Sequence, residues 1–393
     1  MNEVQRLATQ GFKLPGDTDI QLAFLSLRIA LKGYFSTYKA CKGDFDPVEP
    51  KLDESMEENI LYYEAYAETI VHFQHFFELI IKHILRGDHA LLASRISSDP
   101  IILHKILHGE HLTSDEDNNL QSIEFSDALK TICSLLKDNQ LRDSHRFKYI
   151  VDNRSSLEEL NRLRNRVWHR GAYFLSYTTL DQFVGRYVLP IVKLTLELPL
   201  YASVKTWKYK SVHCSLDPID TIIAGYDASK IPSSGKIALL KEMGRAAYSN
   251  PLIDKSTIIK RMNERIVKIE KEIAELETRG EEIPKRLLIS KGATDISYRV
   301  ANQIDAPYIE KARKIAEHEA EKEFFKIKLC PVCGVKSLVL YEESDFYEDA
   351  ETGKDIQFNW IDKVRCECCS FEIDHKLEIG KYDLGIEDYW NPD

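Results

Sequence analysis

Two pairs of cysteines near the end of the sequence constrain the fold of this chain more than any other feature. Cys330 and Cys333 form a C-x-x-C pair in LCPVCGVKS, and Cys366 and Cys369 form another in VRCECCSFE. Such a turn points backbone amides toward the sulfurs, and Gly334 permits the tight reversal after the first pair. The start, MNEVQRLATQGFKLPGD, lacks the apolar run of a secretory signal. We therefore expect a cytoplasmic protein whose clustered cysteines bind metal rather than form disulfides.

Between the pairs lie two segments rich in β-forming residues, SLVLYEE and IQFNWIDKV, separated by an acidic stretch that contains a glycine. This arrangement resembles a zinc ribbon over about residues 328–376, which implies a β-hairpin that brings four thiolates around a structural Zn²⁺. Cys368 or His375 is an alternative ligand in the second half. We favour Cys366 and Cys369 because they repeat the spacing of the first pair.

The first 200 residues predict helices, with no alternation of strands and helices. Apolar residues recur with helical spacing in five segments: 18–41, about 57–86, 120–138, 156–173 and 177–198. Pro190 lies inside the last of these, where it predicts a kink. Because no strands are available as a second layer, these helices are expected to pack on one another as an all-α bundle.

A second helical region follows a mixed segment, residues 201–226, which predicts a connector. Six apolar residues there are spaced alternately three and four apart: Ile259, Met262, Ile266, Ile269, Ile273 and Leu276. The pattern spans fewer than three heptads, so it favours one arm of a helical hairpin over a free-standing coiled coil. The segment 306–326, rich in Ala, Glu and Lys, is the expected second arm.

Four domains follow from these patterns: an N-terminal helical segment (1–50), a helical bundle (51–225), a helical linker or hairpin (226–327) and a zinc ribbon with an acidic tail (328–393). Residues 341–393 contain 16 Asp/Glu and five Lys/Arg, a net charge of −11, so the rest of the chain sums to +1. An acidic tail repels phosphate and favours a protein partner there over nucleic acid. No run reaches the ~18 uncharged apolar residues of a membrane span, so no membrane association is expected.

The segment SLEELNRLRNRVWHRGAY, residues 156–173, carries an unusual set of polar side chains. Its apolar stripe consists of Leu157, Leu160, Leu163 and Val167. Arg164 falls inside this stripe, and a cation that faces a core needs a partner or a purpose. Residues 142–170 hold eight Lys/Arg against four Asp/Glu, which suits a phosphate backbone.

The spacing R-x-x-x-x-H is weak evidence alone, because it occurs twice. Arg313 and His318 share it on a charged, exposed-looking face, RKIAEHEAEKE. The first occurrence, L-x-x-L-R-N-x-x-x-H in a helical bundle, resembles the HEPN family (higher eukaryotes and prokaryotes nucleotide-binding). The family motif is Arg, a polar residue, three variable residues and His, and the resemblance covers roughly residues 55–200.

The resemblance implies a HEPN-like bundle within a mainly α protein, and metal-independent cleavage of RNA by a homodimer. The implied catalytic residues are Arg164, Asn165 and His169, with Glu78 in HFFELIIKHIL as a supporting acid. On the helical wheel Arg164 and His169 lie about 140° apart, so two copies would pool their side chains in one cleft. RNA contacts are expected from the neighbouring side chains Arg162, Arg166, Trp168 and Arg170.

The sequence thus predicts an endoribonuclease of the toxin or antiviral-defence kind, which binds Zn²⁺ for structure only. The alternative is a non-catalytic dimeric adaptor that holds a protein partner through its acidic zinc ribbon. Nucleotide hydrolysis is poorly supported. Gly235-Lys236 matches the end of a phosphate-binding loop, but the first position of that loop needs glycine and is Lys230 here.

Overall fold

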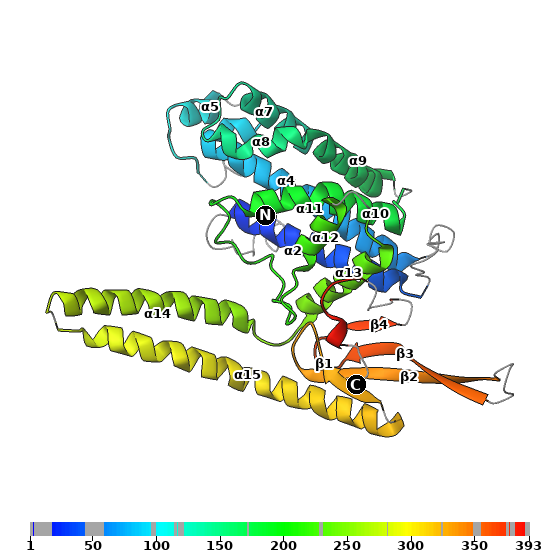
Figure 1. Ribbon diagram of the computed structural model, residues 1–393. Helices are drawn as coiled ribbons and strands as arrows, with labels where there is room; N and C mark the ends of the chain where they lie inside the picture. The colour runs from blue at the N-terminus through cyan, green and yellow to red at the C-terminus, as the bar shows by residue number, and fades with distance from the viewer. Residues whose placement is uncertain are drawn as a thin grey trace. The chain divides into compact units, whose positions relative to one another are not determined.

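The computed structural model (Figure 1) describes residues 3, 18–43, 59–95, 100–113, 116, 122–170, 173–227, 231–280, 282–323, 325–348, 355–374, 377 and 382–389. The chain forms two compact units. The first unit comprises Met1–Phe45, Pro50–Lys208 and Ile223–Ile231. The second comprises Asp46–Glu49, Tyr209–Ile222 and Pro232–Asp393. Among the described residues, no helix has both the length and the apolar character needed to cross a membrane.

The first unit is a helical bundle built around α4 (Ile60–Asp88). Helices α2 (Thr18–Cys41), α7 (Phe125–Lys137) and α9 (Arg154–Arg170) all pack against α4. Buried side chains cover more than half of the circumference of α4, as expected for a helix that other helices contact on several sides. Asn59 caps its start, since its side chain accepts a hydrogen bond from the Tyr62 amide at 3.0 Å. The prediction of an all-α first half is therefore confirmed for the described residues.

The segment predicted as one kinked helix, 177–198, forms three consecutive elements. They are α10 (Tyr177–Phe183), a π-helical turn η3 (Val184–Val188) and α11 (Leu189–Leu196). Pro190 lies in the first turn of α11, directly after the π turn. A proline removes one backbone donor and crowds the preceding turn, so a local change of helical pitch at this point is its expected consequence.

Three shorter helices of this half and its connector were not predicted: α5 (Pro100–Leu107), α8 (Ser144–Asp152) and α12 (Pro218–Asp227). The segment 201–226, expected to be a connector, ends in the helix α12. Asp217 caps the start of α12, since its Oδ1 accepts hydrogen bonds from the amides of Ile219 and Asp220 at 3.0 and 3.2 Å. This is the bonding of an N-cap aspartate.

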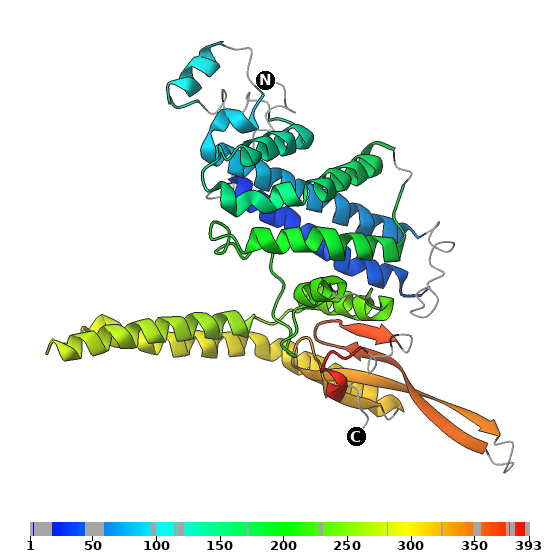
Figure 2. The same ribbon diagram turned by 45° about the horizontal axis from the view of Figure 1, so that its top comes forward.

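The second unit contains α13 (Ser234–Ser249), a helical hairpin and a four-stranded antiparallel sheet (Figure 2). The hairpin consists of α14 (Lys255–Thr278) and α15 (Lys285–Glu323), which lie side by side. The second arm thus begins well before residue 306, where the sequence placed it. Pro307 lies inside α15 without ending the helix.

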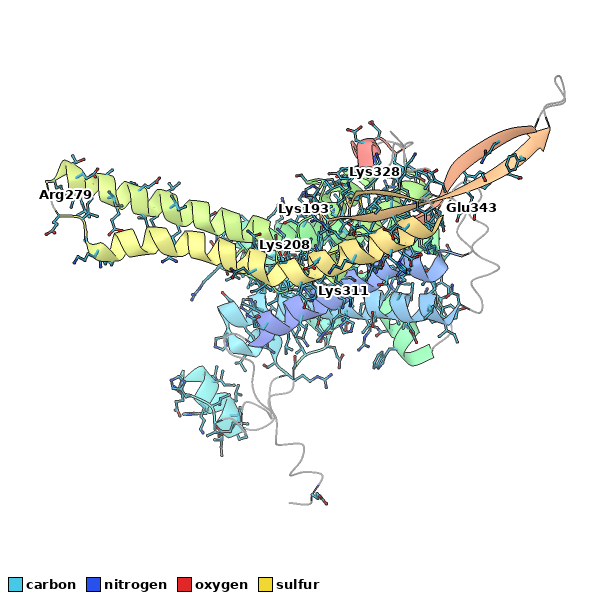
Figure 3. The ribbon with its side chains drawn as sticks, turned by 90° about the horizontal axis from the view of Figure 1, so that it is seen from below. Lys193, Lys208, Arg279, Lys311, Lys328 and Glu343 are labelled. Atoms are coloured by element: carbon cyan, nitrogen blue, oxygen red, sulfur yellow. The ribbon has the colours of Figure 1, made fainter. Side chains whose placement is uncertain are left out.

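The sheet has the strand order β1-β2-β3-β4. Its strands are β1 (Lys326–Leu329), β2 (Lys336–Glu348), β3 (Asp355–Cys366) and β4 (Glu372–Asp374), and a short 3₁₀ turn η5 (Glu387–Tyr389) follows. The helix α15 packs against β1 and β2. The outer part of the β2–β3 hairpin, which carries Glu343, extends beyond β1 and β4, and Arg279 lies at the far end of the helical hairpin (Figure 3).

Candidate functional site

The arginine-rich helix α9 presents its apolar stripe to the bundle, as predicted. Leu157, Leu160 and Leu163 are almost completely buried, at 1%, 1% and 3% exposure, and α9 packs against α4. Val167 is only half-buried, so the stripe weakens toward the end of the helix. The stripe therefore fixes which residues of α9 face α4, and it brings Arg164 to the boundary between the core and the surface.

Arg164 spans this boundary. Its Nε atom is buried and has no hydrogen-bond partner. Its Nη1 atom donates to the Asn165 side-chain oxygen at 3.0 Å, and its guanidinium carbon lies 5.9 Å from the centre of the Trp168 ring. A buried donor without an acceptor is costly, by about 1–3 kcal/mol. The guanidinium thus retains donor capacity for an anion that reaches this edge of α9.

A half-buried ion pair lies on α4. The Glu78 carboxylate accepts a hydrogen bond from Lys82 Nζ at 2.6 Å and another from Gln74 Nε2 at 2.9 Å. Burial raises the pKa of Glu78, but these hydrogen bonds outweigh it and hold the pKa below its ordinary value. Glu78 is therefore a carboxylate at neutral pH. The structure places it on the helix that packs against α9, and its supporting role stays a prediction.

His75 joins the same helix face and was missed by the sequence analysis. Its Nδ1 atom is hydrogen-bonded to Ser26 Oγ of α2 at 2.8 Å. Burial lowers the pKa of His75, Glu78 opposes this effect, and the positive charges of Lys82 and Arg164 add to it. An imidazole with a lowered pKa is neutral near pH 7 and can accept a proton. The signal in the sequence is the spacing H-x-x-E-x-x-x-K, which places all three side chains on one helix face.

His72 lies one turn before His75 on α4. Its Nδ1 atom is buried without a hydrogen-bond partner, and burial followed by the charge of His75 lowers its pKa. Together with Arg164, these side chains form what we call the α4–α9 cluster, defined as His72, His75, Glu78, Lys82 and Arg164. The cluster combines a cation with spare donors, neutral imidazoles and a fixed carboxylate.

The side chains predicted to contact RNA occupy different faces of α9. Trp168 is 65% exposed, so it is a surface residue rather than part of the core. Arg166 stacks on the Tyr173 ring, with its guanidinium carbon 4.6 Å from the ring centre. Arg162 pairs with Glu159 at 3.1 Å. The side chains of His169 and Arg170 lie outside the described residues, so their predicted roles stay predictions.

Arg162 also borders a hollow of about 250 Å³ between α7 and α9. The hollow is lined by Phe125, Ser126, Leu129, Glu158, Asn161 and Arg162. Arg164 is absent from its lining, so the hollow and the α4–α9 cluster occupy separate faces of α9. Arg162 and Arg164 therefore do not converge on one point within a single chain.

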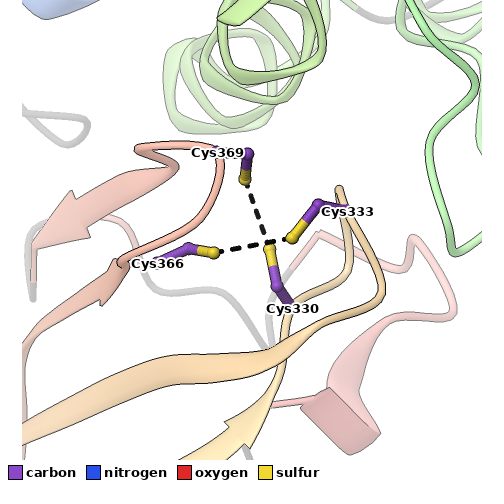
Figure 4. Close-up of side chains that lie close together, drawn as sticks. All are labelled: Cys330, Cys333, Cys366 and Cys369. Carbon is purple, nitrogen blue, oxygen red and sulfur yellow. Dashed lines mark hydrogen bonds between the residues drawn. The ribbon is translucent and has the colours of Figure 1, made fainter. Parts of the chain in front are cut away.

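The four predicted metal ligands do converge. The sulfurs of Cys330, Cys333, Cys366 and Cys369 all lie within 4.8 Å of one another (Figure 4). Cys368 is not part of this group, and His375 lies outside the described residues. The choice of Cys366 and Cys369 in the second pair is therefore confirmed by the geometry.

The two cysteine turns have the same local structure. In the first, Cys330 Sγ accepts a hydrogen bond from the Val332 amide at 3.4 Å, and in the second Cys366 Sγ accepts one from the Cys368 amide at 3.4 Å. Hydrogen bonds from Cys330 and Cys333 hold the pKa of Cys366 far below its ordinary value. Four clustered thiols are a donor set typical of structural zinc sites, which leave no open position for substrate. The residues present thus fit a metal ion.

The chain was compared with protein families, with curated proteins and with solved structures. No family model matches the chain, and no curated protein or solved structure matches it either. The resemblance to HEPN domains therefore depends on the motif Arg164, Asn165 and His169.

Proposed function

We propose that this protein is a metal-independent endoribonuclease of the HEPN type, which acts as a toxin or antiviral-defence effector. The observation that supports this most is the position of Arg164, whose Nε is buried in the core and whose charge acts on His75 of α4, on a helix that continues into Asn165 and His169. A bundle that needs only stability has no use for a buried guanidinium nitrogen without an acceptor. The Nη groups of the same guanidinium lie at the surface, where an RNA phosphate would accept hydrogen bonds from them.

The proposed reaction needs one proton acceptor, one proton donor and a cation. The ribose 2′-oxygen attacks the adjacent phosphorus, a histidine takes the 2′-OH proton, and the bond from phosphorus to the 5′-oxygen breaks. An acid returns a proton to that leaving oxygen. Histidine suits both proton transfers near neutral pH. Arginine stays charged and forms forked hydrogen bonds to phosphate oxygens, so Arg164 would stabilise the charge that builds on the phosphorane.

A homodimer is part of the proposal. Arg164 and His169 are five positions apart on α9, about 140° around the helix, so one copy cannot aim both at one phosphate. Two α9 helices that face each other would supply two arginines and two histidines to a shared cleft. Zn²⁺ in the cysteine site would support the fold and take no part in the reaction.

The products provide the direct test. Purified protein incubated with RNA is expected to leave a 2′,3′-cyclic phosphate and a 5′-OH, and the rate should survive EDTA within the first minutes. Freely exchanging Mg²⁺ is removed at once, whereas metal buried among four thiolates leaves slowly. End-group mapping of the fragments measures this. Fragments with a 3′-OH and a 5′-phosphate, or immediate loss of activity in EDTA, would indicate a metal-dependent nuclease instead.

His75 should contribute to the same reaction. Replacing it by glutamine retains a side chain that can bond to Ser26 but removes the titrating ring. We expect cleavage to slow by about 10²-fold in single-turnover assays, in the range of a lost general acid or base. His83→Gln, on the same helix but outside the cluster and hydrogen-bonded to Tyr201, is the matched control and should cost much less. Equal rates for His75→Gln and wild type would remove His75 from the site.

The alternative is a non-catalytic adaptor that binds a basic protein partner through the outer part of the β2–β3 hairpin. Residues 342–362 contain eight Asp/Glu and one Lys, so this projection carries most of the negative charge of the tail. Phe346 is 63% exposed on it. An adaptor of this kind would retain its partner and leave RNA intact, and the product assay above separates the two functions.

A further inference from the structure

Helix α13, outside the cysteine ribbon, contains a buried ion pair. Glu242 and Arg245 lie one turn apart on α13, and their side chains are only 2% and 11% exposed. Arg245 donates from Nε to Glu242 Oε2 at 2.7 Å and from Nη2 to Glu242 Oε1 at 2.6 Å. Both carboxylate oxygens are thus engaged by one guanidinium. A forked pair of this geometry is rigid, because it fixes both side chains in one plane.

The pair binds the chain that leaves the second cysteine turn. Arg245 Nη1 donates to Ser370 Oγ at 3.3 Å, and Nη2 donates to the Ser370 carbonyl oxygen. Glu242 Oε1 accepts a hydrogen bond from the Glu372 amide at 2.8 Å. Ser370 is the residue after Cys369, and Glu372 begins β4. The ion pair is therefore hydrogen-bonded to the residues that directly follow Cys369 in the chain.

Ser370 needs this support because of its backbone. Its φ is +59°, in the left-handed region that few residues other than glycine adopt. The equivalent position of the first turn is Gly334, with φ +72°. The two positions also make the same hydrogen bond, from Gly334 N to Cys330 O at 2.9 Å and from Ser370 N to Cys366 O at 3.0 Å. The second turn thus has a serine at the position where the first has a glycine. Arg245 of α13 donates its hydrogen bonds to that serine.

The first turn is braced from outside as well. The amides of His213 and Cys214 donate to the carbonyl oxygens of Val332 and Pro331 at 3.0 and 2.9 Å. A Cβ atom added to Gly334 would lie 2.6 Å from His213 Nδ1, so the ring packs directly on the glycine. Both turns of the metal site are therefore held by chain segments far from the ribbon in sequence.

We propose that Arg245 and Glu242 are positioning residues of the metal centre. They hold residues 366–372 in the conformation in which Cys366 and Cys369 face the first pair, so the site is a composite of the ribbon and α13. Metal binding and the attachment of α13 to the ribbon are then coupled, and loss of either weakens the other. The proposal does not depend on RNA cleavage.

The test is the rate at which the zinc-loaded full chain releases metal to excess 4-(2-pyridylazo)resorcinol. Arg245→Ala is expected to release zinc at least tenfold faster, in the range of lost outer-shell contacts. Glu242→Gln should release it faster as well, though less so, because one oxygen can still accept. Arg245→Lys keeps the charge but loses the fork, so it should behave more like alanine than like wild type.

The matched control is Arg365→Ala. Arg365 directly precedes Cys366 and pairs with Glu367 at 3.2 Å, but its side chain is 48% exposed. The Arg365→Ala variant loses a positive charge beside the ligands but keeps the hydrogen bonds from Glu242 and Arg245. It should release zinc at the wild-type rate. Equal acceleration by Arg365→Ala would show a general charge effect and overturn the positioning role.

Two further readouts keep the proposal testable if Arg245→Ala folds poorly. The Co²⁺-loaded Glu242→Gln and Arg245→Lys proteins should retain tetrahedral thiolate bands while losing metal faster, which a misfolded site would not do. Removal of metal from the wild type should increase amide hydrogen exchange in α13, residues 234–249. Unchanged exchange in α13, or wild-type release rates for both conservative variants, overturns the inference.

Discussion

Replacing His169 by alanine is expected to abolish RNA cleavage, and Arg164→Ala should do the same. The loss should be about 10²–10⁴-fold for the histidine, the usual contribution of a proton-transfer group. For the arginine we expect about 10²–10³-fold, comparable to removing a donor that stabilises developing negative charge. Rates are measured under single-turnover conditions on a defined RNA, with circular dichroism and light scattering to show that fold and assembly persist.

The chain contains its own control for this experiment. Arg313 and His318 repeat the R-x-x-x-x-H spacing on α15, where both side chains are exposed. Arg313→Ala and His318→Ala carry the same chemical changes at the same spacing and should leave cleavage unchanged. If the wild type cuts RNA and the Arg164 and His169 variants cut equally well, the assignment of the site is wrong. If the wild type cuts no RNA, the adaptor function becomes the better account.

The sequence predicted those elements whose pattern is set within one segment. The stripe of Leu157, Leu160 and Leu163 is buried as its spacing required, and the misplaced Arg164 has a buried nitrogen, as its position in the stripe implied. The cysteine pairs were equally informative. A C-x-x-C turn fixes local sulfur geometry by itself, so the only question left was which turns meet.

The parts that could not be predicted depend on contacts between distant segments. Helix α13 is buried on nearly all sides, and with many small residues it shows no one-sided apolar stripe. A periodicity argument has nothing to detect in such a helix. The sequence therefore gives no reason to expect Arg245 and Glu242 to be buried. Only the packing of α13 against residues 370–372 shows that they are.

His75 was missed for a related reason. In the sequence it is one of several histidines in an apolar helix, and a histidine in such a place is usually structural. Its hydrogen bond to Ser26 and its proximity to Arg164 join three helices that are far apart in the chain. A single sequence provides no measure of such proximity, whereas H-x-x-E-x-x-x-K spacing at least places the three α4 side chains on one face.

Removing one metal ligand is expected to have the largest effect on the second unit. Cys330→Ser should reduce bound zinc from one equivalent per chain to nearly none. Cys330 is fully buried, and its sulfur lies 3.6 Å from that of Cys369. Binding of a structural zinc ion contributes about 10 kcal/mol or more to the stability of a small site at neutral pH, so a three-ligand remnant should not hold the ribbon together.

The expected consequence is local. Residues 326–374 should lose hydrogen-exchange protection in Cys330→Ser, and the helical signal of the first unit should persist, because its core around α4 contains none of the cysteine ligands. The matched control is Cys368→Ser, which changes a neighbouring thiol that stands outside the group of four. It should bind one equivalent of zinc, as the wild type does. Loss of zinc in Cys368→Ser with retention in Cys369→Ser would reverse the ligand assignment, and cooperative loss of the whole helical signal in Cys330→Ser would mean that the bundle depends on the metal for its own stability.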